Sequence, residues 1–145
     1  MRSGTEAVEL ILGLQGALES LPEPKQQEER QTALWEYARQ SLLATGFAAI
    51  NSPPCASPYI LNISVPGYRS ETLLHFLESR GVYVSSGSAC AKGRGSYVLR
   101  EMGLADERVD SALRISFSRE STPEDIDRLC AALGEAGKSL RKAVK

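Results

Sequence analysis

Two short segments in which apolar and polar residues alternate constrain the fold of this chain most strongly. The sequence YILNISV occupies residues 59–65, and ALRISFS occupies residues 112–118. Successive side chains of a β-strand point to opposite sides, so each segment predicts a strand with one apolar face. The two faces consist of Leu61, Ile63 and Val65, and of Leu113, Ile115 and Phe117. Because an apolar sheet face must be buried against other elements, the rest of the chain has to cover it.

Four segments repeat apolar residues at spacings of three and four, the period of one helical face. We expect helices over residues 6–21, 25–45 and 71–80, and a last helix that Thr122 caps and that begins at Pro123. Their apolar stripes are Val8, Ile11, Leu14, Leu18 and Leu21; Leu34, Tyr37, Ala38 and Leu42; Leu73, Leu74 and Leu77; and Ile126, Leu129, Cys130 and Leu133. The order predicts an α+β fold in which helices pack on one face of a short sheet.

Local signals mark where several elements begin and end. Thr122 and Asp125 form the pattern of a capping box, which starts a helix. Gly81 is placed to end the third helix, since glycine accepts positive φ. A short strand is expected over 82–84, and a short helix, YVLREM, is expected after Ser96, whose hydroxyl can cap it.

Length and composition exclude several classes of protein. The 145 residues fit one domain, and the formal net charge of −1 gives no basis for binding nucleic acid or an acidic membrane. No apolar run approaches the roughly 20 residues of a membrane span, and no signal peptide opens the chain, so a cytoplasmic protein is expected. Three cysteines and one histidine, without a C-x-x-C pair, predict neither a disulfide framework nor a metal site.

The sequence VSSGSACAKGRGSY, residues 84–97, places Cys90 among serines and glycines. Lys92 and Arg94 follow closely, and nearby cations favour a reactive thiolate. Composition alone leaves the alternative of an ordinary turn that happens to hold a cysteine. The other two cysteines are weaker candidates, because Cys55 lies in a proline-rich loop and Cys130 lies on a helical core stripe.

Arg114 is the second candidate for a functional residue. It falls on the polar face of the strand over 112–118, opposite Leu113 and Ile115. A guanidinium there could bind a substrate carboxylate through two hydrogen bonds, and an arginine that is only solvated or salt-bridged is an equally good interpretation. His75 is expected to be a surface residue rather than a catalytic base.

Four blocks of sequence together resemble a known family. VSSGSAC, SYVLREMGL, ALRISFSR and TPEDIDRL are similar to the carboxyl-terminal part of the cysteine desulfurases, pyridoxal-phosphate enzymes of the class V aminotransferase superfamily (fold type I). MRSGTEAVELILGL resembles the family segment that starts with an R-S-G-T motif and continues into a long helix. The resemblance covers about residues 2–137.

The resemblance implies roles for three residues. Cys90 matches the catalytic cysteine, which takes sulfur from L-cysteine as a persulfide and releases L-alanine. Arg114 matches the arginine that binds the substrate carboxylate. Thr5 matches a threonine that contacts the phosphate of the cofactor, pyridoxal 5′-phosphate, in a homodimer. The family delivers the sulfur to acceptor proteins, either an iron–sulfur scaffold or a carrier for tRNA thiolation.

The resemblance also implies a division of the chain. Residues 1–22 would be a helix connecting to a cofactor-binding domain, and residues 23–137 would be a small α+β domain with the cysteine loop at 85–96. Residues 138–145 would be a frayed basic tail. The family's cofactor-linking lysine precedes the R-S-G-T motif, so we expect the chain to be a fragment, inactive alone and without bound cofactor.

Three alternatives stay open from the sequence. The chain could be a non-enzymatic persulfide carrier, or a module for scaffold binding or dimerisation. It could also belong to an enzyme similar to selenocysteine lyase. The sequence AKGRG after Cys90 is shorter and more basic than the serine-rich continuation of the family, so the identity of the sulfur acceptor is left open.

Overall fold

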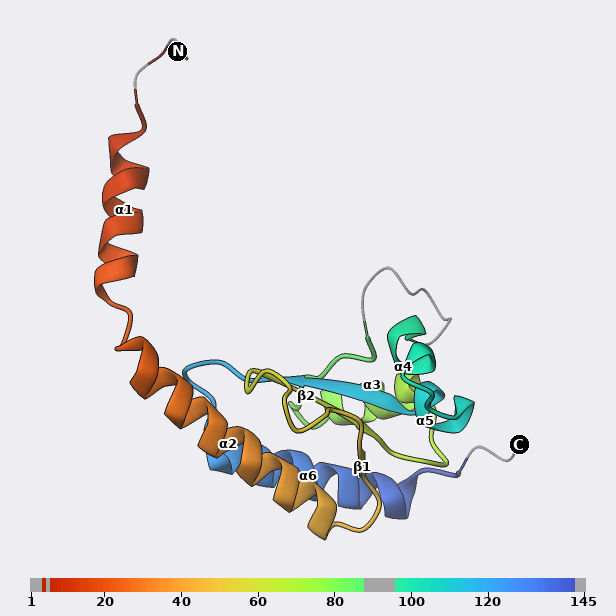
Figure 1. The fold of residues 1–145 in the computed structure, drawn as a ribbon. Coiled ribbons are helices and arrows are strands. Elements are labelled where there is room, and N and C mark those ends of the chain that lie inside the picture. The colour runs from red at the N-terminus through yellow and green to blue at the C-terminus, as the bar shows by residue number, and fades with distance from the viewer. Residues whose placement is uncertain (1–3, 5, 88–95, 143–145) are drawn as a thin grey trace.

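The structure is a computed structural model that describes residues 4, 6–87 and 96–142. Figure 1 shows a helical layer beneath a small sheet, with one helix extending away from both. The elements, in chain order, are α1 (Val8–Glu19), α2 (Pro24–Ala44), β1 (Ala49–Ile50), β2 (Ile60–Ser64), α3 (Ser70–Glu78), α4 (Tyr97–Glu101), α5 (Asp106–Asp110), β3 (Ala112–Ser116) and α6 (Pro123–Ser139).

The sheet has three antiparallel strands in the order β1-β2-β3. Its register pairs Leu61 with Ile115 and Asn62 with Arg114. The predicted apolar faces of β2 and β3 are buried as expected. The expected strand over 82–84 is wrong: the structure has a single bridge there, between Ser85 and Arg114 on the outer edge of β3. The two-residue strand β1 was not predicted, because two residues are too few to show alternation.

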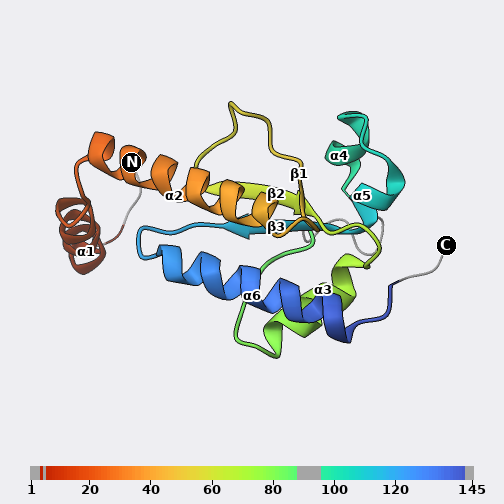
Figure 2. The same ribbon diagram turned by 90° about the horizontal axis from the view of Figure 1, so that it is seen from below.

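Three helices, α2, α3 and α6, lie on one face of the sheet (Figures 1 and 2). Their apolar side chains and those of β2 and β3 form one core, with Leu42, Leu61, Ile63, Leu73, Leu77 and Leu113 fully buried. Burial of apolar surface is the main favourable term in folding, so this layer provides most of the stability of the domain. The prediction of an α+β fold with helices on one face of a short sheet is confirmed.

The stripe predicted for α2 is shifted in the structure. Tyr37 is 39% exposed, and its hydroxyl donates a hydrogen bond to Asp127 on α6 at 2.7 Å. Trp35 is buried instead, and its indole N–H donates to the carbonyl of Ile60 at the start of β2, at 3.0 Å. Gln31 is also buried, with its amide nitrogen bonded to the carbonyl of Ser118 at 2.7 Å. Helix α2 is therefore bonded to the sheet layer through the buried side chains of Gln31 and Trp35.

The short helices α4 and α5 stand at one end of the sheet and have a small core of their own. This core consists of Leu99, Val109 and Ala112, with Leu104 packed against it. The prediction that Ser96 caps α4 is confirmed, since its hydroxyl accepts a hydrogen bond from the N–H of Leu99. The sequence analysis did not predict α5, which has a single turn and one buried residue.

The end of α3 and the start of α6 follow the expected signals. Gly81 has φ of +72°, and the N–H groups of Gly81 and Val82 bond to carbonyls of the last turn of α3, as the glycine pattern predicts. At the start of α6, the Asp125 carboxylate accepts the N–H of Thr122 at 3.0 Å, which confirms the capping box.

Helix α1 makes no contribution to the core. No residue in it is buried, and Figure 1 shows it projecting away from the sheet and the other helices. Its expected stripe of Val8, Ile11, Leu14, Leu18 and Leu21 is therefore exposed. A helix this apolar is normally covered, so α1 is an unpartnered element in the isolated chain.

Candidate functional site

Of the three predicted site residues, Arg114 falls within the part of the chain that the structure describes. Cys90 and Thr5 lie outside the described residues, and their roles stay predictions. The described residues that flank Cys90 are Gly87 on one side and Ser96 on the other. The site is therefore built from Arg114 and from the residues that hold it.

The backbone of Arg114 is bonded directly to the start of the predicted cysteine loop. Its N–H donates to the carbonyl of Ser85 at 2.5 Å, and its carbonyl accepts the N–H of Ser85 at 3.0 Å. The Ser85 hydroxyl in turn donates to the carbonyl of Gly87 at 2.8 Å. Strand β3 thus fixes the residue at which the segment 85–96 begins.

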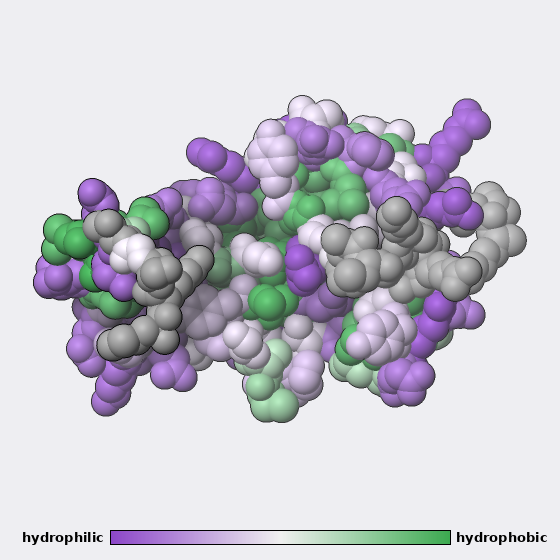
Figure 3. All heavy atoms as spheres, turned by 90° about the horizontal axis from the view of Figure 1, so that it is seen from above, coloured by the Kyte–Doolittle hydropathy of each residue, from purple (hydrophilic) through white to green (hydrophobic). Residues whose placement is uncertain are grey.

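The side chain of Arg114 lies on the sheet face opposite the helical layer, because its neighbours Leu113 and Ile115 point into the core. Figure 3 views this face and shows apolar side chains between polar ones over its middle. Arg114 is half-buried, and its Nε is buried without a hydrogen-bond partner among residues 4, 6–87 and 96–142. Nor do the described carboxylates form an ion pair with it. A half-buried guanidinium in this state favours an anion as its partner.

A polar network that the sequence analysis missed lies beside Arg114 on the same face. The Asn51 amide nitrogen donates to Oδ1 of Asn62 and to the hydroxyl of Ser64, both at 2.7 Å. Nη2 of Arg108, on α5, donates to Oδ1 of Asn51 at 2.5 Å and to the carbonyl of Ile50 at 2.8 Å. Asn51 and Ser64 are buried, so the network is fixed rather than solvated.

One signal for this network was present in the sequence. Asn62 lies on the polar face of its strand, which is the side that carries Arg114 in the facing strand. Asn51 stands just before the proline-rich loop, where a polar residue predicts only a turn. The contribution of Arg108 could not be read from the chain, because it comes from the helix that was not predicted.

The described cysteines have environments unlike that of a reactive thiolate. Cys130 is half-buried on α6 and packs against the core, as expected. Burial, together with the nearby Asp127 carboxylate, raises the pKa of the Cys130 thiol. Cys55 is exposed in the proline-rich loop. The expectation that His75 is a surface residue is confirmed, since it is exposed and lies 3.7 Å from the Glu78 carboxylate.

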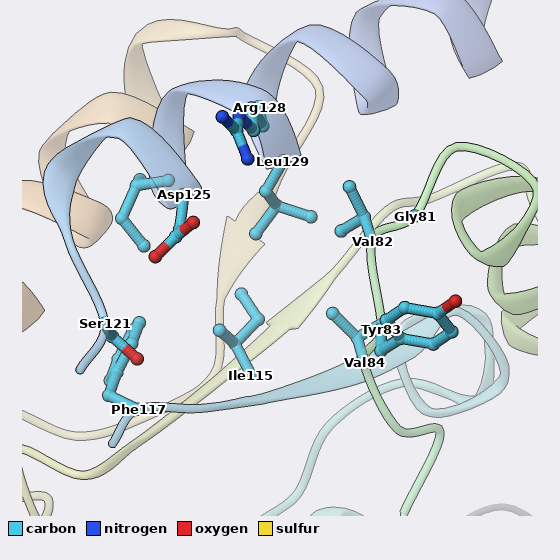
Figure 4. Close-up of a pocket in the computed structure, with 11 residues that line it drawn as sticks. Gly81, Val82, Tyr83, Val84, Ile115, Phe117, Ser121, Asp125, Arg128 and Leu129 are labelled. Atoms are coloured by element: carbon cyan, nitrogen blue, oxygen red, sulfur yellow. The ribbon is translucent and has the colours of Figure 1, made fainter. Parts of the chain in front are cut away.

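A small cavity of about 150 Å³ lies on the other side of β3, toward the helices. Figure 4 shows the side chains of Val82, Val84, Ile115 and Leu129 turned toward one another across it. The same cavity reaches Asp125 and Arg128 at the start of α6. Because Ile115 points away from the face that carries Arg114, this cavity is not part of the arginine site.

No group of three or more His, Cys, Asp or Glu side chains in the described part of the chain is placed to hold a metal ion. No helix within it is both long enough and apolar enough to cross a membrane.

Comparisons with known proteins give a consistent result. The family model for class-V aminotransferases matches residues 1–129. The chain is 35% identical to the putative cysteine desulfurase IscS 1 of Bacillus subtilis strain 168, over 96% of this chain and 38% of that protein. It is also 35% identical to the cysteine desulfurase IscS of Acinetobacter baumannii strain AYE, over 98% of this chain and 36% of that protein.

Solved structures agree with these relatives. A NifS-like protein aligns with a TM-score of 0.74 and 29% identity, over 96% of this chain and 36% of that one. A NifS-like protein from Rickettsia africae ESF-5 aligns with a TM-score of 0.70 and 30% identity, over 94% of this chain and 36% of that one. The chain thus spans little more than a third of the length of the proteins it matches.

Proposed function

The chain belongs to the class-V aminotransferase family, and we propose that it is the carboxyl-terminal part of a cysteine desulfurase. In this proposal Cys90 accepts sulfur and Arg114 binds the carboxylate of L-cysteine. The observation that carries the proposal is the pair of backbone hydrogen bonds between Arg114 and Ser85. They join the strand of the carboxylate-binding residue to the segment that bears the cysteine, in a chain similar to named cysteine desulfurases over nearly its whole length.

The proposed reaction balances without an external oxidant or reductant. L-Cysteine and the Cys90 thiol give L-alanine and a Cys90 persulfide: the carbon–sulfur bond of the substrate breaks, and a sulfur–sulfur bond forms on Cys90. A thiolate is the attacking species in such a step, and Lys92 and Arg94 are close to Cys90 in sequence. Breaking the carbon–sulfur bond is the chemistry that pyridoxal phosphate supplies when bound.

The described residues do not fit pyridoxal phosphate by themselves. Its aldehyde needs a lysine, and the described lysines are Lys25 in the first turn of α2, Lys138 in the last turn of α6, and Lys142 beyond it. Lys25 and Lys138 belong to helices that pack on the sheet face opposite Arg114, and the Lys142 side chain lies against Gly67. Thr5 would supply a phosphate contact only. We therefore propose that the cofactor's main site belongs to the part of the relatives' length that this chain does not span.

Arg114 would act on the substrate through its charge and shape. The planar guanidinium can hold both oxygens of a carboxylate, and a half-buried position strengthens the pairing relative to bulk water. With the carboxylate bound at β3, the substrate is held beside the strand to which Ser85 is bonded. Further proposals are homodimer formation and delivery of sulfur to an iron–sulfur scaffold or a tRNA-thiolation carrier.

Mass spectrometry of the purified chain tests the role of Cys90. The chain is incubated with a low-molecular-weight persulfide, alkylated, digested and mapped. A sulfur adduct confined to Cys90 supports the proposal. Equal adducts on Cys55 and Cys130, or none on Cys90, would contradict it. The Cys90→Ser variant is the matched control, since it keeps the size of the side chain and loses the acceptor sulfur.

A non-enzymatic persulfide carrier is the second candidate, because accepting sulfur on Cys90 from another persulfide needs no cofactor. Alanine release from L-cysteine separates the candidates. We expect the 145-residue chain with added pyridoxal phosphate to release no alanine. We expect activity when the chain replaces the matching part of the Bacillus subtilis relative in a chimera. An inactive chimera that still accepts persulfide on Cys90 would favour the carrier.

A further inference from the structure

The side chain of Asn62 lies directly across the sheet from Arg114. The two residues are register partners between β2 and β3. Their backbone groups do not bond to each other, because Arg114 bonds to Ser85, while Asn62 bonds to the Ser52 hydroxyl and the Asn51 N–H on the β1 side. A pair of this non-hydrogen-bonded kind brings its side chains closest, with Cβ atoms about 4.5–5.5 Å apart.

A chain of hydrogen bonds fixes the direction in which the Asn62 amide faces. It begins at Arg108, whose guanidinium can only donate. The Arg108 contact therefore requires the oxygen of Asn51 on that side, and the Asn51 nitrogen on the other side donates to Oδ1 of Asn62. Reversing either amide would set two donors against each other. The positive charge of Arg108 thus determines the polarity of both asparagines.

The amide nitrogen of Asn62 is consequently turned away from Asn51. Asn51 follows β1, and β1 and β3 lie on opposite sides of β2, so the network leaves the Asn62 nitrogen available to a ligand on the side of β3. Within the described part of the chain, the Asn62 nitrogen has no hydrogen-bond acceptor, while its oxygen is occupied. Asn62 is half-buried and is the register partner of Arg114, so its two N–H groups are a donor held on the same sheet face as the guanidinium.

We propose that Asn62 is a second carboxylate-binding residue, whose side-chain N–H donates to the carboxylate that Arg114 holds. This inference rests on the proposed function of Arg114. Both groups offer only donors on this face, which selects a planar anion over a cation or an amide. The network behind Asn62 holds the donor in place before the ligand arrives, and preorganisation of this kind raises affinity.

The test titrates the 145-residue chain with acetate and with L-alanine, followed by nitrogen-15 NMR of side chains. We expect saturable shifts of the Asn62 amide and of the Arg114 Nε–H, and no comparable shift of the Asn51 amide. Arg114→Ala should abolish saturation. No saturable response in the wild-type chain would overturn the carboxylate site, Asn62 included, and would leave the Cys90 persulfide experiment standing as a separate test.

The isosteric variant Asn62→Asp tests the contribution of the Asn62 N–H groups separately from that of its oxygen. Its carboxylate still accepts the hydrogen bond from Asn51, so the network is retained, and the N–H groups are lost. We expect binding of both probes to weaken by at least about tenfold, the effect of one lost charge-assisted hydrogen bond. Unchanged binding in Asn62→Asp, with binding abolished in Arg114→Ala, would overturn this inference and leave the role of Arg114 intact.

Ser116→Asp is the matched control for charge. Ser116 is exposed on the same face, two residues along β3 from Arg114, so the variant adds a carboxylate near the guanidinium without removing a donor. A much smaller loss of affinity than in Asn62→Asp supports the proposal. An equal loss would mean that repulsion alone explains the Asn62→Asp result, and would overturn it. Thermal unfolding of each variant confirms that the comparison is made between folded chains.

Discussion

At the scale of single residues, Asn51 makes more structural contacts than its position beside a loop indicates. Its side chain forms hydrogen bonds with Arg108 on α5 and with Asn62 and Ser64 on β2, and so joins these two elements. Removing it takes away three side-chain hydrogen bonds and leaves Oδ1 of Asn62 without its partner, while Ser64 and Arg108 keep one bond each. The network is therefore expected to stabilise the domain as well as orient Asn62.

We predict that Asn51→Ala lowers the free energy of unfolding by about 1–3 kcal/mol, the effect of losing three side-chain hydrogen bonds in a largely buried network. Urea unfolding followed by the fluorescence of Trp35 measures it. Ser116→Ala is the control, because Ser116 is exposed on the same sheet, and it should change the free energy by less than about 0.5 kcal/mol. Equal effects of the two substitutions would show that the network contributes nothing.

The two described cysteines should differ in reactivity because their surroundings differ. The pKa of Cys130 is raised by burial and by Asp127, so at a given pH less of it is thiolate, and the half-buried thiol is also less accessible. In a Cys90→Ser background at pH 8, we expect a disulfide reagent to modify Cys55 well before Cys130. The difference should vanish in urea. Equal rates in the folded chain would contradict the described environment of α6.

The raised pKa of Cys130 also has a consequence for stability. A thiol whose pKa is higher in the folded state than in the unfolded state contributes to stability. This contribution is fully present when the pH is below the pKa of the unfolded state, about 8.5. This contribution is lost as the pH rises through the folded value. Stability should therefore fall at alkaline pH, and the fall should be smaller in Cys130→Ala than in the wild-type chain.

At the scale of elements, the start of α6 depends on one carboxylate. Asp125 accepts the N–H and the hydroxyl of Thr122. We predict that Asp125→Ala lowers the free energy of unfolding by about 1 kcal/mol, the typical value of a helix cap. Asp125→Asn keeps an oxygen that can accept, so it should retain most of the stability. An equal loss in Asp125→Asn and Asp125→Ala would show that the charge, rather than the acceptor oxygen, is what matters.

The elements with a long, clean pattern were predictable, and those defined by tertiary contacts were not. The spacing along α2 favoured Tyr37, yet a phenol can reach water and Asp127, while Trp35 gains more by burying its large ring and bonding to Ile60. Residues 82–84 looked like a strand from their composition, but pairing with β3 extends only to Ser85. The arginine of the site was found from alternation, and its asparagine network was not, since Arg108 comes from an unpredicted turn of helix.

At the scale of the whole molecule, α1 is separate from the energetics of the folded domain. Its apolar residues lie on more than one side of the helix, and Leu10, Leu12 and Leu14 are each at least 60% exposed. Such exposure is unfavourable in water and is relieved when the surface is covered. In the purified 145-residue chain, the apolar side chains of α1 can be buried against α1 of another copy.

We therefore predict that the chain self-associates through α1 and that deletion of residues 1–22 gives a monomer. Because no residue of α1 is buried in the domain, the deletion should change the free energy of unfolding by less than about 0.5 kcal/mol. Sedimentation velocity measures the association, and urea unfolding measures the stability. The double variant Leu10→Glu, Leu14→Glu is a milder version, since it disrupts the apolar surface and leaves the length of the chain unchanged. If the deleted chain still associates, the contact lies elsewhere on the molecule. If it loses several kcal/mol, α1 packs on the domain in solution, and the exposed position described for it is wrong.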